Sequence, residues 1–286
     1  MKSLCIKTNN SDTITYLLNE LKTSNIKNIC FSENQFKNYK NVIIHYTGND
    51  NNYFCSEISK ILCFYIIDIE EENLLKRFLS HNYFYLDSNE KSKVIEICFD
   101  IISENYPEQF NEKIETLHNS FYKYILSNKS IVLDGFINFR IQEYINILDD
   151  LLIDAVNHFI IEKEYLEFIS LLKLYISSQP SGCDLVHLVY SSSEAVLLDK
   201  NKNLIITSND VFKAKYLSDI TFSSNDYALN TLLNLLPKKI YIHIIDNHID
   251  DFINTLKLVF ENRVNLCIGD CDICNIYKIS ESNFQK

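Results

Sequence analysis

The first part of the chain, residues 1–106, alternates strand-like and helix-like patterns of hydrophobic and polar residues. Short apolar runs that predict strands lie at Leu4–Ile6, Ile29–Phe31 and Val42–Tyr46. The stretches between and after them carry apolar side chains at three- and four-residue spacing, which predicts amphipathic helices. Ser11 is expected to cap the first helix, and Pro107 closes the segment. We expect a small N-terminal α/β lobe.

The middle of the chain, residues 107–180, follows the 3.6-residue period of an α-helix. Its apolar stripes comprise Ile114, Leu117, Phe121 and Ile125, and then Ile137, Ile141, Tyr144, Leu148, Leu152, Ala155 and Phe159. One unbroken helix from Asp134 to Ser178 would be about 67 Å long, which is longer than a compact domain accommodates. We therefore expect a break between Asn157 and Glu164.

The last part, residues 181–286, changes to a two-residue period. The runs that predict a β-meander are Leu185–Tyr190, Ala195–Leu198 and Leu204–Thr207. A helix follows, from about Asp226 to Leu236. The next three runs, which predict a right-handed βαβ unit, are Ile240–Ile245, Ile249–Phe260 and Val264–Ile268. The expected fold class is α+β, with a central helical segment between an N-terminal and a C-terminal α/β lobe.

Two short motifs in the helical segment are the most distinctive parts of the sequence. Residues 134–140 read DGFINFR, and residues 162–172 read EKEYLEFISLL. Both resemble the signature of the sporulation protein YtxC family of endospore-forming bacteria. The resemblance extends over the whole chain and implies an association with sporulation, but it implies no catalytic or binding residue. We expect the first motif to be helical, with Phe136 and Phe139 buried and Arg140 bonded to a carboxylate.

The composition is that of a folded globular protein, since 47% of the residues are hydrophobic and 23% are charged. The formal net charge is −11 at pH 7, so a nucleic acid would approach against a repulsive field. We therefore expect no nucleic-acid binding. The chain contains no GxGxxG, P-loop, GxSxG or HExxH motif, and its four glycines leave little material for a phosphate-binding loop.

The first residues of the chain carry no apolar stretch of the kind found in a signal peptide. The longest apolar runs, such as Ile61–Ile67, are much shorter than the ~20 residues that cross a bilayer. Nine cysteines, an odd number in a chain without export features, favour reduced thiols over a disulfide framework. We expect a cytoplasmic protein that does not insert into a membrane.

The sharpest chemical signal is a C-x3-C-x2-C motif formed by Cys267, Cys271 and Cys274. This spacing occurs in the iron–sulfur loop of radical SAM enzymes, but no barrel is expected after it here. Structural zinc fits better, because Cys271-x2-Cys274 can form a metal knuckle and Gly269 permits a tight turn. His248 is the expected fourth ligand, since the βαβ unit brings it to the same edge of the sheet.

Asp246 and Cys183 are further candidates for the fourth position. Two other interpretations of the cysteines stay open. They can pack as small hydrophobic residues, as free cysteines often do, or they can have a redox role.

Four charged residues of the helical segment are candidates for a structural or partner-binding surface. Arg140 is expected to pair with Glu143 or Asp134, although its guanidinium could also hold an anion. Glu164 and Glu167 lie on one helix face, where we expect them to be solvated or to bond Arg140. They could also act as paired carboxylates.

His187 and His243 alternate with apolar neighbours in predicted strands, and we expect both to be structural. The first hypothesis for function is a non-enzymatic interaction or scaffold protein with a protein partner. The second is a zinc-binding sensor or metal-dependent enzyme that uses the C-terminal cysteines.

Overall fold

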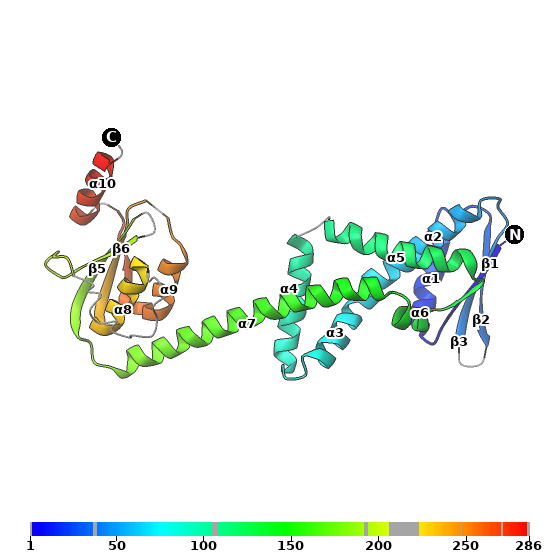
Figure 1. Cartoon of the computed structure of the whole chain (residues 1–286), viewed down its shortest axis with the longest axis horizontal. Coiled ribbons are helices and arrows are strands. Elements are labelled where there is room, and N and C mark those ends of the chain that lie inside the picture. Colours follow the sequence, from blue (N-terminus) through cyan, green and yellow to red (C-terminus); the bar gives the residue numbers. More distant parts are fainter. Residues whose placement is uncertain are drawn as a thin grey trace, which may run out of the picture. The chain divides into compact units, whose positions relative to one another are not determined.

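The computed structural model describes residues 2–36, 39–104, 108–191, 194–205, 223–246, 248–269 and 271–284. The protein has two compact units, unit 1 (Met1–Glu162) and unit 2 (Lys163–Lys286). Each unit contains a four-stranded sheet and several helices, so the α+β class is confirmed (Figure 1). The division into three domains stays a prediction.

Unit 1 is built on a sheet of order β2-β3-β1-β4. Its strands are β1 (Lys2–Thr8), β2 (Ile29–Phe36), β3 (Tyr39–Tyr46) and β4 (Ser130–Val132). Strand β3 pairs antiparallel with both β1 and β2, and β4 pairs parallel with β1. The three predicted strands are confirmed. The sequence analysis missed β4, which lies inside the predicted helical segment.

The helices of unit 1 are α1 (Ser11–Thr23), α2 (Asn51–Tyr65), α3 (Glu71–Asn82), α4 (Ser88–Glu104), α5 (Glu108–Ser127) and α6 (Leu133–Phe139). Helix α1 begins at Ser11 itself, so the predicted cap is wrong by one residue. The cap is Asn10, whose side chain accepts a hydrogen bond from the Asp12 amide at 2.8 Å. A π-helical turn, Ile66–Glu70, leads from α2 into α3.

A charged triad is buried in the core of unit 1. The Lys113 ammonium lies 2.7 Å from one carboxylate oxygen of Glu71, and both side chains are at most 5% exposed. The Tyr144 hydroxyl donates to the other carboxylate oxygen. Burial, followed by the charge of Glu71, raises the pKa of Tyr144. The Glu71 carboxylate therefore satisfies the polar groups of both Lys113 and Tyr144 away from water.

The DGFINFR motif is helical, as predicted, over the residues of α6. Phe136 is 4% exposed and stacks on Phe121 with ring centroids 4.5 Å apart. The prediction for Phe139 is wrong, since that side chain is 82% exposed. Arg140 is exposed at the C-terminal end of α6, and its guanidinium lies 5.8 Å from the centroid of the Tyr124 ring. Among the described residues, no carboxylate bonds Arg140, so this part of the prediction is wrong there.

Helix α7 (Gln142–Ser178) continues through the predicted break between Asn157 and Glu164. The first part of the helix belongs to unit 1 and the last part to unit 2, since the boundary between the units follows Glu162. It is about 55 Å long. The prediction of a break assumed that the whole helix lies inside one compact domain, and that assumption is wrong. Of the helices in the described ranges, none is both long and apolar enough to span a membrane.

Unit 2 is built on a sheet of order β6-β5-β7-β8. Its strands are β5 (Cys183–Ser191), β6 (Glu194–Leu198), β7 (Pro237–Ile244) and β8 (Val264–Leu266). Its further helices are α8 (Ser224–Leu235), α9 (Asp251–Phe260) and α10 (Asp272–Phe284). Strand β6 is antiparallel to β5, whereas β5, β7 and β8 are parallel. The predicted β7-α9-β8 unit is therefore confirmed.

The third strand of the predicted meander lies partly outside the described residues, and Leu204 forms an isolated bridge with Leu198. The two faces of the sheet in unit 2 pack against different helices. Val186, Leu188, Ile240 and Ile242 face a core that includes side chains of α7, α8 and α9. Val189 on the opposite face packs with Ile273 and Cys274 of α10. The second face is the one that carries the candidate site.

Candidate metal centre

Strand β7 places His243 on the α10-covered face of the sheet. Side chains alternate between the two faces of a strand, and Ile242 and Ile244 pack into the core on the opposite side. In the parallel register, Val189 pairs with His243 and His187 pairs with Tyr241. His187 and His243 are therefore diagonal neighbours on one face, and their ring centroids lie 5.2 Å apart.

Cys267 follows directly after β8 and extends its pairing with β7. The Cys267 amide donates to the carbonyl oxygen of Ile242 at 2.8 Å, which places Cys267 beside His243. Gly269, with a φ of 95°, then turns the chain toward α10. This left-handed conformation favours glycine over a residue with a side chain.

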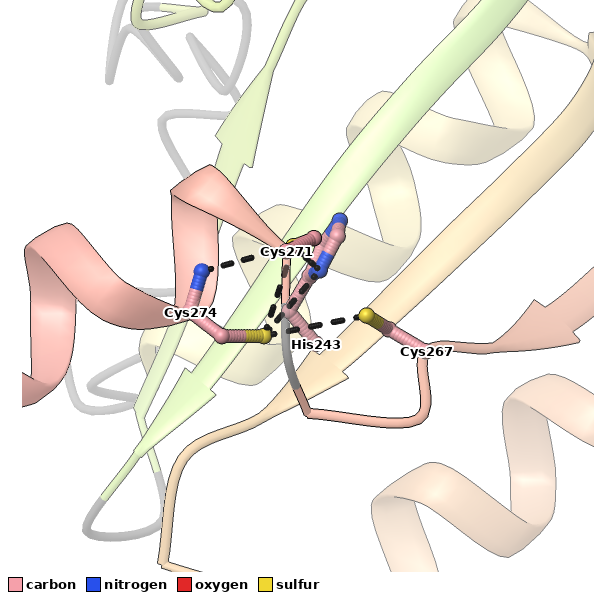
Figure 2. A group of neighbouring side chains, drawn as sticks. All are labelled: His243, Cys267, Cys271 and Cys274. Atoms are coloured by element: carbon pink, nitrogen blue, oxygen red, sulfur yellow. Dashed lines mark hydrogen bonds between the residues drawn. The ribbon is translucent and has the colours of Figure 1, made fainter.

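The other two cysteines belong to the start of α10. Cys271 directly precedes the helix, and Cys274 lies in its first turn. The Cys274 amide donates to the Cys271 sulfur at 3.4 Å, so this sulfur caps the first turn. The two cysteines of the predicted knuckle thus lie together at a helix start, near Cys267 and His243 (Figure 2).

Four donor atoms converge from these elements: the Sγ atoms of Cys267, Cys271 and Cys274, and a ring nitrogen of His243. All lie within 4.8 Å of one another. The Sγ of Cys271 is 3.6 Å from that of Cys274, which is 3.8 Å from that of Cys267. The Nδ1 of His243 is 3.3 Å from the Cys271 sulfur and 3.5 Å from the Cys274 sulfur (Figure 2).

These separations can be compared with the edges of a zinc tetrahedron. With Zn–S bonds of about 2.3 Å and Zn–N bonds of about 2.0–2.1 Å, tetrahedral angles give S···S edges of about 3.8 Å and S···N edges of about 3.5 Å. Four of the six separations agree with these edges, namely 3.6 and 3.8 Å between sulfurs and 3.3 and 3.5 Å from sulfur to nitrogen, and the other two are at most 4.8 Å. The four residues could therefore hold a metal ion with little rearrangement.

The centre is partly shielded from water. His243 is 3% exposed and Cys274 is 0% exposed, whereas Cys267 and Cys271 are half-buried. Burial, with smaller contributions from His187 and Lys202, lowers the pKa of His243 to about 4. The imidazole is therefore neutral near pH 7, which is the form that binds metals.

The thiols differ in their acidity. Burial acts to raise the pKa of Cys271, but hydrogen bonds from the Cys274 amide and from the Cys267 and Cys274 side chains hold it below its ordinary value. Burial raises the pKa of Cys274 to about 12, and the neighbouring thiols of Cys271 and Cys267 add to this effect. Cys271 is thus the more acidic of the two knuckle thiols.

His187 is the neighbour that orients His243. Its Nδ1 lies 3.0 Å from the Nε2 of His243, on the side of the ring away from the sulfurs. If Nδ1 of His243 binds a metal, Nε2 carries the hydrogen and donates it to His187. Metal-binding histidines usually have such a partner, which fixes the tautomer and the ring orientation. Burial lowers the pKa of His187, which favours the neutral, accepting form.

The structure brings together the three predicted cysteines with His243 rather than with His248. His248 is exposed in the loop after β7, where its amide donates to Asp246 at 3.0 Å. Asp246 belongs to the same loop, and Cys183 begins β5 at the opposite end of that strand from Val189. We therefore place His243 at the fourth position in place of these three candidates.

The two histidines were assigned a structural role because each was considered alone. The sequence did carry a usable signal: His243 lies near the end of an apolar strand, and Cys267 follows directly after the next parallel strand. Neighbouring parallel strands bring their carboxyl ends to one edge, so the two residues lie side by side. The parallel partner β5 could not be assigned from the sequence, and for that reason the role of His187 was missed.

The four charged candidates of the helical segment do not gather at this centre. Arg140 and Glu143 are exposed in unit 1, at the end of α6 and in the first turn of α7. Glu164 and Glu167 are exposed on the part of α7 that belongs to unit 2. A role for these four residues in binding a partner stays a prediction.

A cavity of about 310 Å³ adjoins the centre. Its walls include Cys267, Cys271 and His243 of the centre, together with His187, Tyr241 and Lys202. The Lys202 ammonium lies 3.1 Å from the carboxylate of Asp272. Two of the three thiols can therefore be reached by a small molecule from this cavity.

Comparison with known proteins assigns the chain to a family. The sequence model of the YtxC-like family matches residues 56–265. The chain belongs to this family. It is 19% identical over 217 residues to the uncharacterized protein YtxC of Bacillus subtilis (strain 168). The aligned region covers 72% of this chain and 74% of that protein. No solved structure matches the chain.

The match to the YtxC-like family includes His187 and His243 and ends at residue 265. The three cysteines of the centre follow that residue. The match therefore covers the strands that carry the two histidines but not the three cysteines.

Proposed function

We propose that the protein binds one zinc ion through Cys267, Cys271, Cys274 and His243. The observation that carries this proposal is the convergence of the four donor atoms within 4.8 Å of one another, with four of their six separations at 3.3–3.8 Å, close to the edges of a zinc tetrahedron. Three thiolates and one imidazole are also the donor set that suits zinc, whereas magnesium and calcium prefer oxygen ligands.

The proposed ion has a structural rather than a catalytic role. Catalytic zinc usually has three protein ligands and keeps one position for water or substrate, whereas four protein ligands close the site. The ion would join β7, the end of β8 and the start of α10. It thereby fastens α10 to the second face of the sheet, where Ile273 and Cys274 supply the buried apolar contact.

We further propose that the protein is a non-enzymatic interaction or scaffold protein of sporulation, located in the cytoplasm. The support for sporulation is the resemblance of DGFINFR and EKEYLEFISLL to the family signature. The support for a reducing compartment is the set of free thiols, which suits zinc binding. A protein partner is proposed over a nucleic acid because the formal net charge is −11.

A zinc-binding sensor is the second candidate function. The cavity beside the centre favours it, because Cys267 and Cys271 are both thiol ligands and part of its walls. A metal-dependent enzyme has less support, since the closed set of four ligands leaves no position for a substrate.

The test of the zinc centre is metal analysis of protein purified under reducing conditions without added chelator. We expect about one zinc ion per chain, and Co²⁺ in its place should give the absorption bands of a tetrahedral thiolate site. Cys271→Ser and His243→Ala should lose the ion. Cys30→Ser, at an exposed thiol outside the centre, and His248→Ala should keep it.

Metal-free protein with an intact fold would overturn the zinc proposal. Loss of zinc from His248→Ala with retention in His243→Ala would instead return the fourth position to His248. The role in sporulation has a separate test: deletion of the gene should lower the yield of heat-resistant spores and leave vegetative growth unchanged. Equal spore yields would exclude that role.

A further inference from the structure

We propose that the zinc centre is a peroxide-responsive switch, in which Cys271 and Cys274 form a disulfide and release the ion. This inference rests on the proposed zinc binding and gives that centre a regulatory role. Three observations support the proposed switch. Cys271 is accessible from the cavity, and the buried Cys274 lies next to it. The ion and the disulfide would also connect different parts of the fold.

Access to the centre is limited to one side. The cavity of about 310 Å³ is lined by Cys271 and Cys267, and it is large enough for a hydroperoxide to reach their sulfurs. Cys274 is 0% exposed and does not line the cavity. The first oxidation is therefore directed to a half-buried thiol, which we assign as Cys271. The buried thiol of Cys274 is protected from the peroxide in the cavity.

Cys274 is in position to resolve the oxidised thiol. Its sulfur lies 3.6 Å from that of Cys271, and the two residues form a C-x2-C pair at the start of α10. A disulfide requires sulfurs about 2.05 Å apart, so the two atoms must approach by a small movement of their side chains. The sulfur of Cys267 is slightly farther from Cys274, at 3.8 Å, and lies on a different element.

The chemistry needs one hydroperoxide and two protons for each disulfide. The Cys271 thiolate attacks one oxygen of hydrogen peroxide, an S–O bond forms, and the O–O bond breaks with release of hydroxide. The Cys274 thiolate then attacks the Cys271 sulfur, the S–S bond forms, and the sulfenic oxygen leaves as a second hydroxide. The two hydroxides take up two protons, and the two sulfurs have given two electrons to the peroxide.

The disulfide and the ion connect different parts of the chain. Zinc would join His243 in β7 and Cys267 after β8 to the start of α10, whereas the disulfide joins two residues three positions apart within that start. Oxidation thus removes two of the four ligands and replaces a cross-link between elements by a local one. Release of α10 from the sheet is the expected structural result.

The experiment uses the full chain loaded with zinc, in the Cys30→Ser background to remove the exposed thiol outside the centre. Zinc content is measured first, and then a few equivalents of hydrogen peroxide are added with a chromophoric chelator. We expect release of about one zinc per chain, loss of two thiols, and a Cys271–Cys274 disulfide in the peptide map. Dithiothreitol with added zinc should restore both the thiols and the bound ion.

The first measurement separates the two proposals. Protein that holds no zinc overturns both the zinc centre and the switch. Protein that holds zinc but keeps it, with all its thiols, under excess peroxide overturns the switch and leaves the zinc centre standing. Zinc release with a Cys267–Cys274 disulfide, or with sulfinic acid and no disulfide, overturns the assignment of Cys271 and Cys274 as the reacting pair.

A variant provides an independent readout. In Cys274→Ser, Cys271 can be oxidised but has lost its resolving partner, so a sulfenic acid at Cys271 should accumulate and react with dimedone. The matched variant Cys267→Ser keeps the reacting pair and should still form the disulfide. Dimedone labelling of Cys271 in both variants to the same extent would show that Cys274 does not resolve it.

Discussion

Replacement of His187 by alanine tests whether this residue, which touches no metal, supports the centre. His187 accepts a hydrogen bond at 3.0 Å from the Nε2 of His243 when Nδ1 of that ring binds the ion. His243 is 3% exposed in the native protein, so its Nε2 depends on His187 for a hydrogen-bond partner. In His187→Ala the imidazole would keep a buried, unpaired N–H, and its ring would lose the contact that orients it.

The expected loss follows from that unpaired donor. A buried polar group without its partner costs about 1–3 kcal/mol. Since 1.4 kcal/mol corresponds to a tenfold change in an equilibrium constant, zinc affinity should fall by about 5-fold to 140-fold. Losses of about 10-fold to 100-fold are typical when the hydrogen-bond partner of a metal-bound histidine is removed. Removal of a ligand should have a larger effect, because it opens the coordination sphere.

The assay is a zinc titration in competition with a chromophoric chelator of known affinity. His187→Asn serves as the conservative variant, since its amide oxygen can accept in place of Nδ1, and it should recover part of the affinity. Tyr241→Phe is the matched control: it retains the aromatic ring, which in the native protein stacks on His187 with centroids 5.9 Å apart. We expect that variant to bind zinc with unchanged affinity.

An affinity of His187→Ala within twofold of the native value would refute this reasoning. It would mean that the orientation of His243 is set by the strand alone. A fall in zinc affinity that His187→Asn does not relieve at all would point to loss of packing instead of loss of the hydrogen bond.

Two further predictions concern the core of unit 1, and both are measured by urea unfolding. Phe136→Ala should lower the free energy of unfolding by about 3–5 kcal/mol. Phe139→Ala, at a side chain that is 82% exposed, should change it by less than ~0.5 kcal/mol. Equal effects of the two substitutions would contradict the assigned faces of α6. Lys113→Met leaves the Glu71 carboxylate buried without its cation and should cost about 3–5 kcal/mol, and a second change, Glu71→Gln, should recover much of that loss. A neutral single variant would show that water reaches the triad.

Much of the architecture was predictable from local patterns, because most elements bury one face and show it in their periodicity. The βαβ unit from β7 to β8 is an example, since each of its strands is an apolar run between polar turns. Strand β4 was not predictable in this way. It has three residues, and its pairing with β1 depends on contacts across more than a hundred positions of the chain.

The site shows the same division between local and distant information. Cys267, Cys271 and Cys274 were recognised because their spacing is local. His243 and His187 come from strands whose neighbours in the sheet are distant in the sequence, and a single histidine in a strand has no local mark of function. The exposure of Phe139 was missed for a related reason. Helical periodicity does not show at which residue a short helix stops packing against the elements around it.

The continuity of α7 has a practical consequence for dissecting the protein. Phe159 belongs to the core of unit 1, while Ile169 and Ile176 belong to the core of unit 2. Any cut that separates the units must therefore fall between Phe159 and Ile169, inside the helix. Such a cut exposes backbone amides and carbonyls that the intact helix pairs. Fragments cut in this window should be capped with added helix-terminating residues. A C-terminal fragment that begins after Ser178 would lack Ile169 and Ile176 and so lose part of the core of unit 2.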